Sequence, residues 1–153
     1  MNQLMEHEVV LQVVVGDTVA SVNQGMTALL SGLEGVSVLG CAQELEKVFL
    51  LIRRVKPDIL LLDLQAMNGH GQRLFKEIRS AQPELTLVVL SAFKMPEVRE
   101  AYLKAGADFF FEKITQLDEL VEMLATRVKE HRQANAKTNP TAIEPLKEID
   151  SKS

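Results

Sequence analysis

Cysteine and paired metal-binding side chains are scarce in this sequence. Its one cysteine, Cys41, allows no disulfide within the chain, which fits a reducing cytosol. The three histidines, His7, His70 and His131, lie far apart, and no Cys/His spacing is typical of a zinc site. We therefore expect a cytoplasmic protein with neither an internal disulfide nor a structural zinc ion.

Long apolar runs and basic clusters are also missing. No apolar run approaches the roughly 18 residues that cross a membrane, and no basic region followed by an apolar run marks a secretory signal. The net charge is -4, and the 17 lysines and arginines are scattered along the chain. A surface that binds nucleic acid would normally be basic. We therefore expect neither a membrane nor a nucleic acid among the partners.

What is present is the composition of one ordinary globular domain. The chain has 153 residues, 46% of them hydrophobic and 25% charged, which is enough for a sizeable core. Short apolar runs typical of strands occupy residues 9–15, 36–40, 59–62, 85–90 and 109–111. Apolar residues recur at helical spacing in residues 19–33, from residue 45 to just before Pro57, around residues 74–78, in residues 96–105 and in residues 117–128.

Turn and capping residues predict where several of these helices begin and end. Pro96 suits the first position of its helix, and Gly106 suits the position just after the end of that helix. Thr115 followed by Asp118 is typical of a capping box before the last helix.

The alternation of strands and helices predicts the fold class. Five strands alternate with five helices, and the separations suit only right-handed crossover units. We therefore expect an α/β fold with a doubly wound, five-stranded parallel sheet. Residues 1–8 are expected to form a polar lead, residues 9–132 the domain, and residues 133–153 a flexible tail in which apolar density drops.

The third strand carries the residue around which the site is predicted. Four apolar residues follow Pro57 and Asp58 and end at Asp63, which is typical of a strand buried on both faces. In open parallel sheets, ligands bind beyond the carboxyl ends of the strands. Asp63 would therefore bring a carboxylate to the functional edge of the sheet.

Three other polar side chains follow strand ends and should lie near Asp63. They are Asp17 after the first strand, Ser91 after the fourth and Lys113 after the fifth. Two carboxylates about 4 Å apart repel by about 4 kcal/mol at a surface-like dielectric, so such a pair favours a hard cation such as Mg²⁺. A hydroxyl and an ammonium opposite that cation would neutralise the oxygens of a phosphoryl group moving onto the carboxylate.

From about residue 9 to about residue 128, the chain resembles the receiver domain of two-component response regulators. The matching segments, in order, are residues 13–17 (VVVGD), 57–63 (PDILLLD), 88–92 (VVLSA) and 106–113 (GADFFFEK). The resemblance implies a (βα)5 flavodoxin-like fold in which Asp63 accepts a phosphoryl group from a histidine kinase. It also implies that Ser91 binds the phosphoryl group and that Lys113 pairs with it.

The resemblance further implies a metal site, a switch residue and partners. Mg²⁺ would bind Asp17, Asp63 and the backbone carbonyl of Gln65, and Phe110 stands where the family has an aromatic that turns inward on activation. The partners would be a histidine kinase or a phosphotransfer protein and a downstream protein. The output face would comprise the helix at 96–105, the strand at 109–111 and the last helix, with a homodimer through this face left open.

The sequence departs from the receiver pattern near the predicted site. Gly16 stands where receivers usually have a second acid, Met67 where they have a proline, His70 where they have an acid, and Ile114 where they have a proline in a cis bond. The loss of the acid at Gly16 should remove carboxylate repulsion and weaken Mg²⁺ binding without excluding it.

Each candidate residue also has a simpler interpretation. Asp63 could be a solvated acid, Asp17 a helix cap, Ser91 a turn hydroxyl, Lys113 a surface lysine and Phe110 an ordinary core residue.

Three functions remain open from the sequence. The first is a phosphoacceptor that is no enzyme beyond self-catalysed phosphotransfer and dephosphorylation. About 20 residues remain after the last helix, so no DNA-binding domain is expected there. The second is a pseudo-receiver that acts as an interaction scaffold without phosphorylation. The third, a flavin or nucleotide enzyme, is disfavoured because the loop after the first strand has one glycine and aromatics are only 5%.

Overall fold

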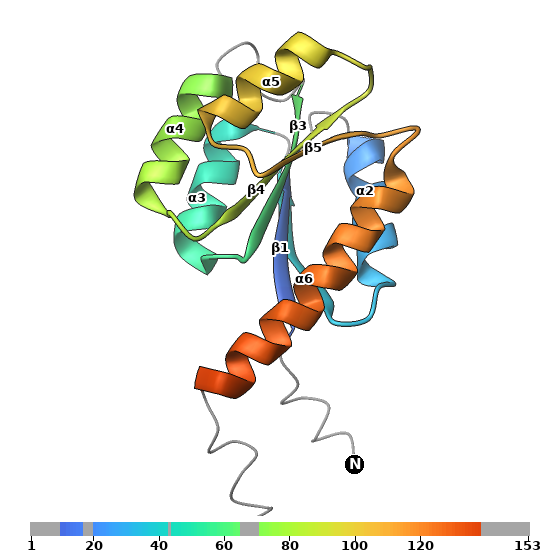
Figure 1. The fold of residues 1–153 in the computed structure, drawn as a ribbon, viewed down its shortest axis with the longest axis vertical. Coiled ribbons are helices and arrows are strands. Elements are labelled where there is room, and N and C mark those ends of the chain that lie inside the picture. Colours follow the sequence, from blue (N-terminus) through green and yellow to red (C-terminus); the bar gives the residue numbers. More distant parts are fainter. Residues whose placement is uncertain (1–9, 17–19, 43, 65–70, 139–153) are drawn as a thin grey trace, which may run out of the picture.

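The structure is a computed structural model that describes residues 10–16, 20–42, 44–64 and 71–138. Within these ranges, strands and helices alternate along the chain (Figure 1). The strands are β1 (Leu11–Gly16), β2 (Val36–Ala42), β3 (Ile59–Asp63), β4 (Thr86–Ser91) and β5 (Phe109–Glu112). The helices are α2 (Ala20–Ser31), α3 (Leu45–Val55), α4 (Gly71–Ala81), α5 (Pro96–Ala105) and α6 (Leu117–Thr138).

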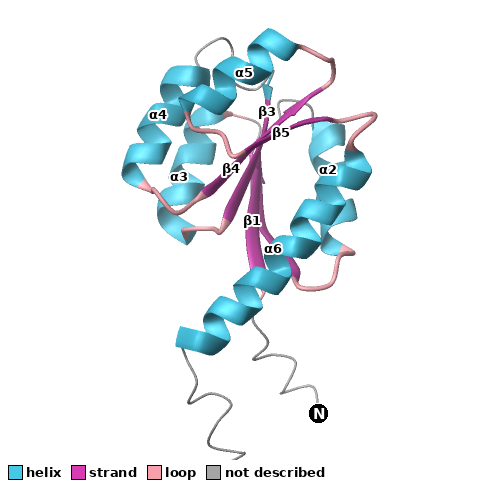
Figure 2. Cartoon of the chain, viewed as in Figure 1, coloured by secondary structure: helices cyan, strands magenta, loops and turns pink. Residues whose placement is uncertain are grey.

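All strands pair in parallel in the order β2-β1-β3-β4-β5. Helices cover both faces of this sheet, with α3, α4 and α5 on one face and α2 and α6 on the other (Figure 2). The predicted doubly wound parallel sheet is confirmed. In this strand order β3 lies in the middle, so its carboxyl end opens between the ends of β1 and β4.

The core has two layers that share the central strands. All five residues of β3 are buried, and their side chains alternate between the layers. Leu60 and Leu62 pack on the α3–α5 side, whereas Ile59 and Leu61 pack on the α2–α6 side. Each buried aliphatic side chain contributes roughly 1.5–3 kcal/mol of transfer free energy. This two-sided burial explains why β3 reads as an uninterrupted apolar run.

Several element ends differ from the predicted ones by a few residues. Strand β2 continues to Ala42, two residues past the expected end, and β5 includes Glu112. The last helix continues to Thr138, six residues past the expected domain end at Arg132, because helical hydrogen bonds do not require the apolar periodicity that ends near Val128. The expected lead at 1–8 and the rest of the expected tail, from residue 139, lie outside the described residues.

The ends of α5 are as predicted, and α6 begins at Leu117, where the helical spacing places its start. Pro96 is in the first turn of α5, and Gly106 follows the helix with φ 125°, a conformation that favours glycine. The Thr115 hydroxyl, the predicted cap of this helix, donates to the Glu112 carboxylate.

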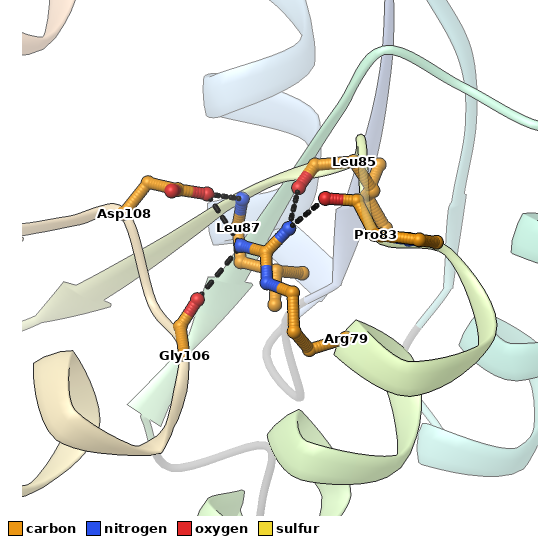
Figure 3. Close-up of polar contacts among 6 residues, drawn as sticks. All are labelled: Arg79, Pro83, Leu85, Leu87, Gly106 and Asp108. Atoms are coloured by element: carbon orange, nitrogen blue, oxygen red, sulfur yellow. Dashed lines mark hydrogen bonds and ion pairs between the residues drawn. The ribbon is translucent and has the colours of Figure 1, made fainter.

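Arg79, near the end of α4, forms hydrogen bonds with the segments that lead into β4 and β5 (Figure 3). One terminal guanidinium nitrogen donates to the carbonyls of Pro83 (2.9 Å) and Leu85 (2.6 Å). The other donates to the Gly106 carbonyl (2.7 Å) and the Asp108 carboxylate (2.6 Å). The same Asp108 oxygen accepts from the Leu87 N–H at 2.8 Å. This Arg79 clamp lies at the sheet edge opposite Asp63 and sets the alignment of two strands that lead to the site.

No helix in the described ranges combines the length and apolarity required to cross a membrane.

Candidate functional site

The carboxyl ends of β3, β4 and β5 bring three predicted site residues together. Asp63 ends β3, Ser91 ends β4, and Lys113 directly follows β5. Register aligns them, since Asp63 lies opposite Leu90 and Ser91 lies opposite Glu112. The Lys113 N–H donates to the Ser91 carbonyl at 2.7 Å, which continues the β4–β5 pairing one residue past the strand. Parallel pairing therefore gathers side chains that are far apart in the sequence.

Asp63 is a buried carboxylate with a cationic partner. Its side chain is 6% exposed, and its Oδ2 forms an ion pair with the Lys113 ammonium, whose side chain is 18% exposed. A carboxylate buried without a partner would cost several kcal/mol, so the ammonium compensates for the lost hydration. The simpler interpretations, a solvated strand-end acid and a surface lysine, do not describe this pair.

Ser91 is buried, but its hydroxyl is engaged in a local turn. The hydroxyl donates to the Phe93 carbonyl at 2.8 Å and accepts from the Phe93 N–H at 3.2 Å. This arrangement matches the simpler interpretation of Ser91 as a turn hydroxyl. The Phe93 side chain is 64% exposed, so the loop that holds Ser91 packs little apolar area there. Serine hydroxyls commonly bond the backbone two residues on, so the residue type is the sequence signal for this turn.

Gly16 ends β1, and the space beside it is filled by apolar side chains. It pairs with Leu62 on β3. A Cβ atom at Gly16 would lie 2.5 Å from Leu62 Cδ1 and 3.0 Å from Val48 Cγ2. At the position where receivers usually carry a second acid, any side chain would therefore require the Leu62 and Val48 side chains to shift.

Phe110 lies in the core, on the opposite side of β5 from its two phenylalanine neighbours. Its side chain is 6% exposed and packs with the α3–α5 layer. Phe109 and Phe111 face α6, with their rings stacked at 5.8 Å between centroids. The pattern predicted a strand here, but the stacking and the Arg127 guanidinium 5.5 Å from the Phe109 ring centre carried no sequence signal.

The remaining predicted site residues lie outside the described residues. These are Asp17, Gln65, Met67 and His70. Of the three predicted Mg²⁺ ligands, the structure therefore describes Asp63 alone. Within the described ranges, no group of three or more His, Cys, Asp and Glu side chains is arranged to hold a metal ion. Ile114, which replaces the usual proline, is described, and its side chain is 78% exposed.

Comparison with known proteins identifies the family. The profile described as the response regulator receiver domain matches residues 13–125, well over half of the chain. The chain belongs to the receiver domain family. The receiver of the putative response regulator NarL from Mycobacterium tuberculosis superimposes with a TM-score of 0.71, at 27% identity, covering 79% of this chain and 98% of that receiver. A response regulator from Thermotoga maritima superimposes with a TM-score of 0.67, also at 27% identity, covering 82% of this chain and 99% of that protein.

Sequence relatives of this receiver are longer regulators. The response regulator GacA of Pseudomonas aeruginosa is 28% identical over 114 residues, covering 74% of this chain and 53% of GacA. The uncharacterized transcriptional regulatory protein YxjL of Bacillus subtilis is 27% identical over 114 residues, covering 74% of this chain and 52% of YxjL. The chain thus spans about half the length of these relatives. Receiver domains are signalling modules of two-component systems, they generally bind Mg²⁺ at an acidic pocket, and response regulators interact with histidine kinases and downstream partners.

Proposed function

We propose that this receiver accepts a phosphoryl group on Asp63 from a histidine kinase or a phosphotransfer protein. The observation that carries the proposal is the Lys113–Asp63 ion pair on a buried carboxylate, one strand away from Ser91. A buried ion pair is a costly way to stabilise a fold, because an apolar pair of similar volume often serves as well or better. An acid and a lysine at a strand-end crevice therefore favour a chemical role.

In the proposed transfer, a carboxylate oxygen of Asp63 attacks the phosphorus of the donor's phosphohistidine. The P–O bond forms as the P–N bond breaks, and the bonding electron pair returns to the imidazole nitrogen. The incoming oxygens would gain the Lys113 ammonium as a neighbour. The Ser91 hydroxyl would exchange its bond with the Phe93 carbonyl for one to a phosphoryl oxygen. Little covalent chemistry is asked of the protein, since positioning and charge neutralisation are what phosphoryl transfer requires.

Asp63, Asp17 and the Gln65 carbonyl are the residues that would hold Mg²⁺ in this receiver. When bound, the ion would neutralise charge on the transferred group. The donor set is all oxygen, as Mg²⁺ prefers. Gly16 supplies no carboxylate, so we expect Mg²⁺ binding to be weaker than in receivers with two acids after the first strand.

Intact-mass measurement after treatment with a small phosphodonor tests this proposal. Wild-type protein should gain the mass of one phosphoryl group in the presence of Mg²⁺ and much less without it. Asp63→Asn should remove the gain, whereas the matched control Asp118→Asn, in the exposed first turn of α6, should keep it. An unchanged wild-type mass, under conditions that label another receiver, would refute phosphorylation of Asp63.

The alternative is a pseudo-receiver that uses the same fold as an interaction scaffold. The apolar packing at Gly16 and the Ser91–Phe93 hydrogen bonds favour it. It predicts that Mg²⁺ leaves the melting temperature unchanged and that partner binding survives Asp63→Asn. Both results together with an unlabelled mass would select the scaffold.

The proposed output is protein contact through the surface of α5, β5 and α6. Phe110, the buried aromatic of β5, would change its packing when Asp63 is phosphorylated and so change that surface. A homodimer through the same surface is the alternative output. The proposed setting is the cytoplasm, where histidine kinases present their phosphodonor.

A further inference from the structure

A groove lies between the outer side of β5 and α6, and its described residues suit one class of partner. Strand β5 is last in the sheet order, so among the described elements α6 flanks it without a further strand beyond. The groove has a volume of about 490 Å³. Its floor is formed by Phe109, Phe111 and Met123. We name this feature the β5–α6 groove.

The floor of the β5–α6 groove is apolar and well ordered by packing. The Phe109 and Phe111 rings are nearly parallel, with 8° between their planes. Phe111 and Met123 are 9% and 8% exposed and belong to the core layer between the sheet and α6, while Phe109 is half-buried. A partner side chain that reaches this floor would exchange water for apolar contact, at about 25 cal/mol for each Å² removed from water.

The rim of the groove is acidic. Glu119, Glu122 and Glu130 line it from α6, and all three are exposed. Arg127 is the one cation among the described lining residues, and it is engaged with the Phe109 ring and with the Glu130 carboxylate at 3.5 Å. The rim therefore presents net negative charge around an apolar floor.

We propose that the β5–α6 groove docks a basic amphipathic segment of a downstream protein. Apolar side chains of that segment would contact the floor, and its lysines or arginines would face Glu119 and Glu122. Charge selects this occupant over a second copy joined groove to groove, because two acidic rims would repel. It also disfavours nucleic acid and anionic lipid. The inference rests on the proposed function in one respect, since it gives the chemistry of the partner that the output surface would bind.

The groove also lies close in the sequence to Lys113, which forms the ion pair with Asp63. Phe111, on the floor, is two residues from Lys113, and the short strand β5 leads directly from one to the other. A docked segment in the groove would therefore contact the strand that directly precedes Lys113, the residue paired with Asp63. Occupation of the groove and modification of Asp63 would then affect each other's free energy through β5.

Titration of the full chain with a labelled synthetic helical peptide of leucine, alanine and arginine tests the inference. The control peptide replaces every arginine with glutamate. Fluorescence anisotropy should show saturable binding of the arginine peptide with a Kd below about 1 mM, weakened by salt, and none of the glutamate peptide. Backbone amide NMR signals of Phe109, Phe111 and Met123 should shift on binding.

Matched charge variants separate the groove from the overall charge of the molecule. The double variant Glu119→Gln with Glu122→Gln should weaken arginine-peptide binding about 5-fold, from two exposed charge contacts of about 0.5 kcal/mol each. The double variant Glu46→Gln with Glu77→Gln changes the net charge equally on α3 and α4, across the sheet, and should change binding less than about 2-fold.

Each outcome bears on the groove independently of phosphorylation. Absence of saturable binding, equal binding of both peptides, or equal weakening by the two double variants would overturn the inference. Because the titration uses the unphosphorylated chain, binding without any labelling of Asp63 would refute the proposed phosphorylation alone. Labelling of Asp63 without peptide binding would refute the groove alone.

Discussion

At the scale of single residues, small differences in side-chain volume determine what the site can hold. Gly16 illustrates this, because the atoms nearest to its missing Cβ belong to Leu62 and Val48, two core residues. Even the smallest side chain at this position must displace packed apolar atoms. Gly16 therefore differs from the receiver pattern in two ways: it supplies no carboxylate to the pocket, and its neighbours Leu62 and Val48 pack against it.

Gly16→Ala is expected to destabilise the fold. The new methyl group would overlap Leu62 Cδ1, and overpacking of this kind costs about 1–3 kcal/mol. Urea denaturation measures the change in the free energy of unfolding. The control is Gly25→Ala in α2, where the new Cβ would meet no atom within 4 Å beyond the neighbouring backbone of its own helix, and a gain of about 0.5–1 kcal/mol is expected there. Equal effects at both glycines would contradict the packing at Gly16.

Ionisation of the buried Tyr102 phenol should make the stability of the fold fall at alkaline pH. Burial raises the pKa of this phenol above its ordinary value, because the low-dielectric core disfavours the charged form. The group thus contributes stability that is present below its unfolded pKa of about 10 and lost as the pH rises through the folded pKa. As Tyr102 is the sole tyrosine of a chain without tryptophan, near-ultraviolet absorbance follows its ionisation directly.

The expected result is ionisation of Tyr102 at a higher pH in the native protein than in urea. The control Tyr102→Phe keeps the edge-on contact with Phe75, whose ring centre lies 5.5 Å away. This variant should lose less stability between neutral and alkaline pH than the wild type does. Identical titration curves in the native and unfolded states would argue against the effect.

At the scale of secondary structure, loops and helix ends align the strands that carry the site. The Arg79 clamp joins the end of α4, the start of β4 and the turn before β5 through one planar guanidinium. Lysine has a single nitrogen and cannot reproduce this set of donors. The clamp lies at the amino ends of β4 and β5, so it acts on Ser91 and Lys113 only through the strands themselves.

Arg79→Lys should lower the free energy of unfolding by about 2 kcal/mol, because carbonyls that accept from the guanidinium lose a charged donor. The estimate is modest because the Arg79 side chain is 27% exposed and its Asp108 partner 38% exposed. Hydrogen exchange should accelerate at Leu87, whose N–H shares the Asp108 oxygen. Arg73→Lys is the control on the same helix, since Arg73 is 84% exposed. Similar losses for both variants would show that the clamp adds nothing specific.

At the scale of the whole molecule, two apolar layers meet on one sheet. Strands β1, β3 and β4 contribute side chains to both layers. Unfolding of one layer would therefore also disrupt the packing of these strands in the other layer. The molecule should therefore unfold as one cooperative unit.

Leu60→Ala and Leu61→Ala test this cooperativity from opposite faces. Both side chains are fully buried, Leu60 in the α3–α5 layer and Leu61 in the α2–α6 layer. Each variant should lower the stability by about 2–5 kcal/mol. Each should also shift the circular dichroism transition and the near-ultraviolet signal of Tyr102 by the same amount. Two separated transitions in either variant would show that the layers unfold independently.

The sequence by itself determined the alternation of elements, the parallel sheet, and the candidates Asp63, Ser91 and Lys113. It could do so because a strand buried on both faces must be apolar throughout, and a polar residue directly after it must emerge at the sheet edge. Tertiary structure alone decided the rest. The filled space beside Gly16 and the acceptors of Arg79 in the segment before β5 depend on distances between chain segments. A periodic pattern records which face a residue occupies, but it does not record which atoms from another segment reach that face.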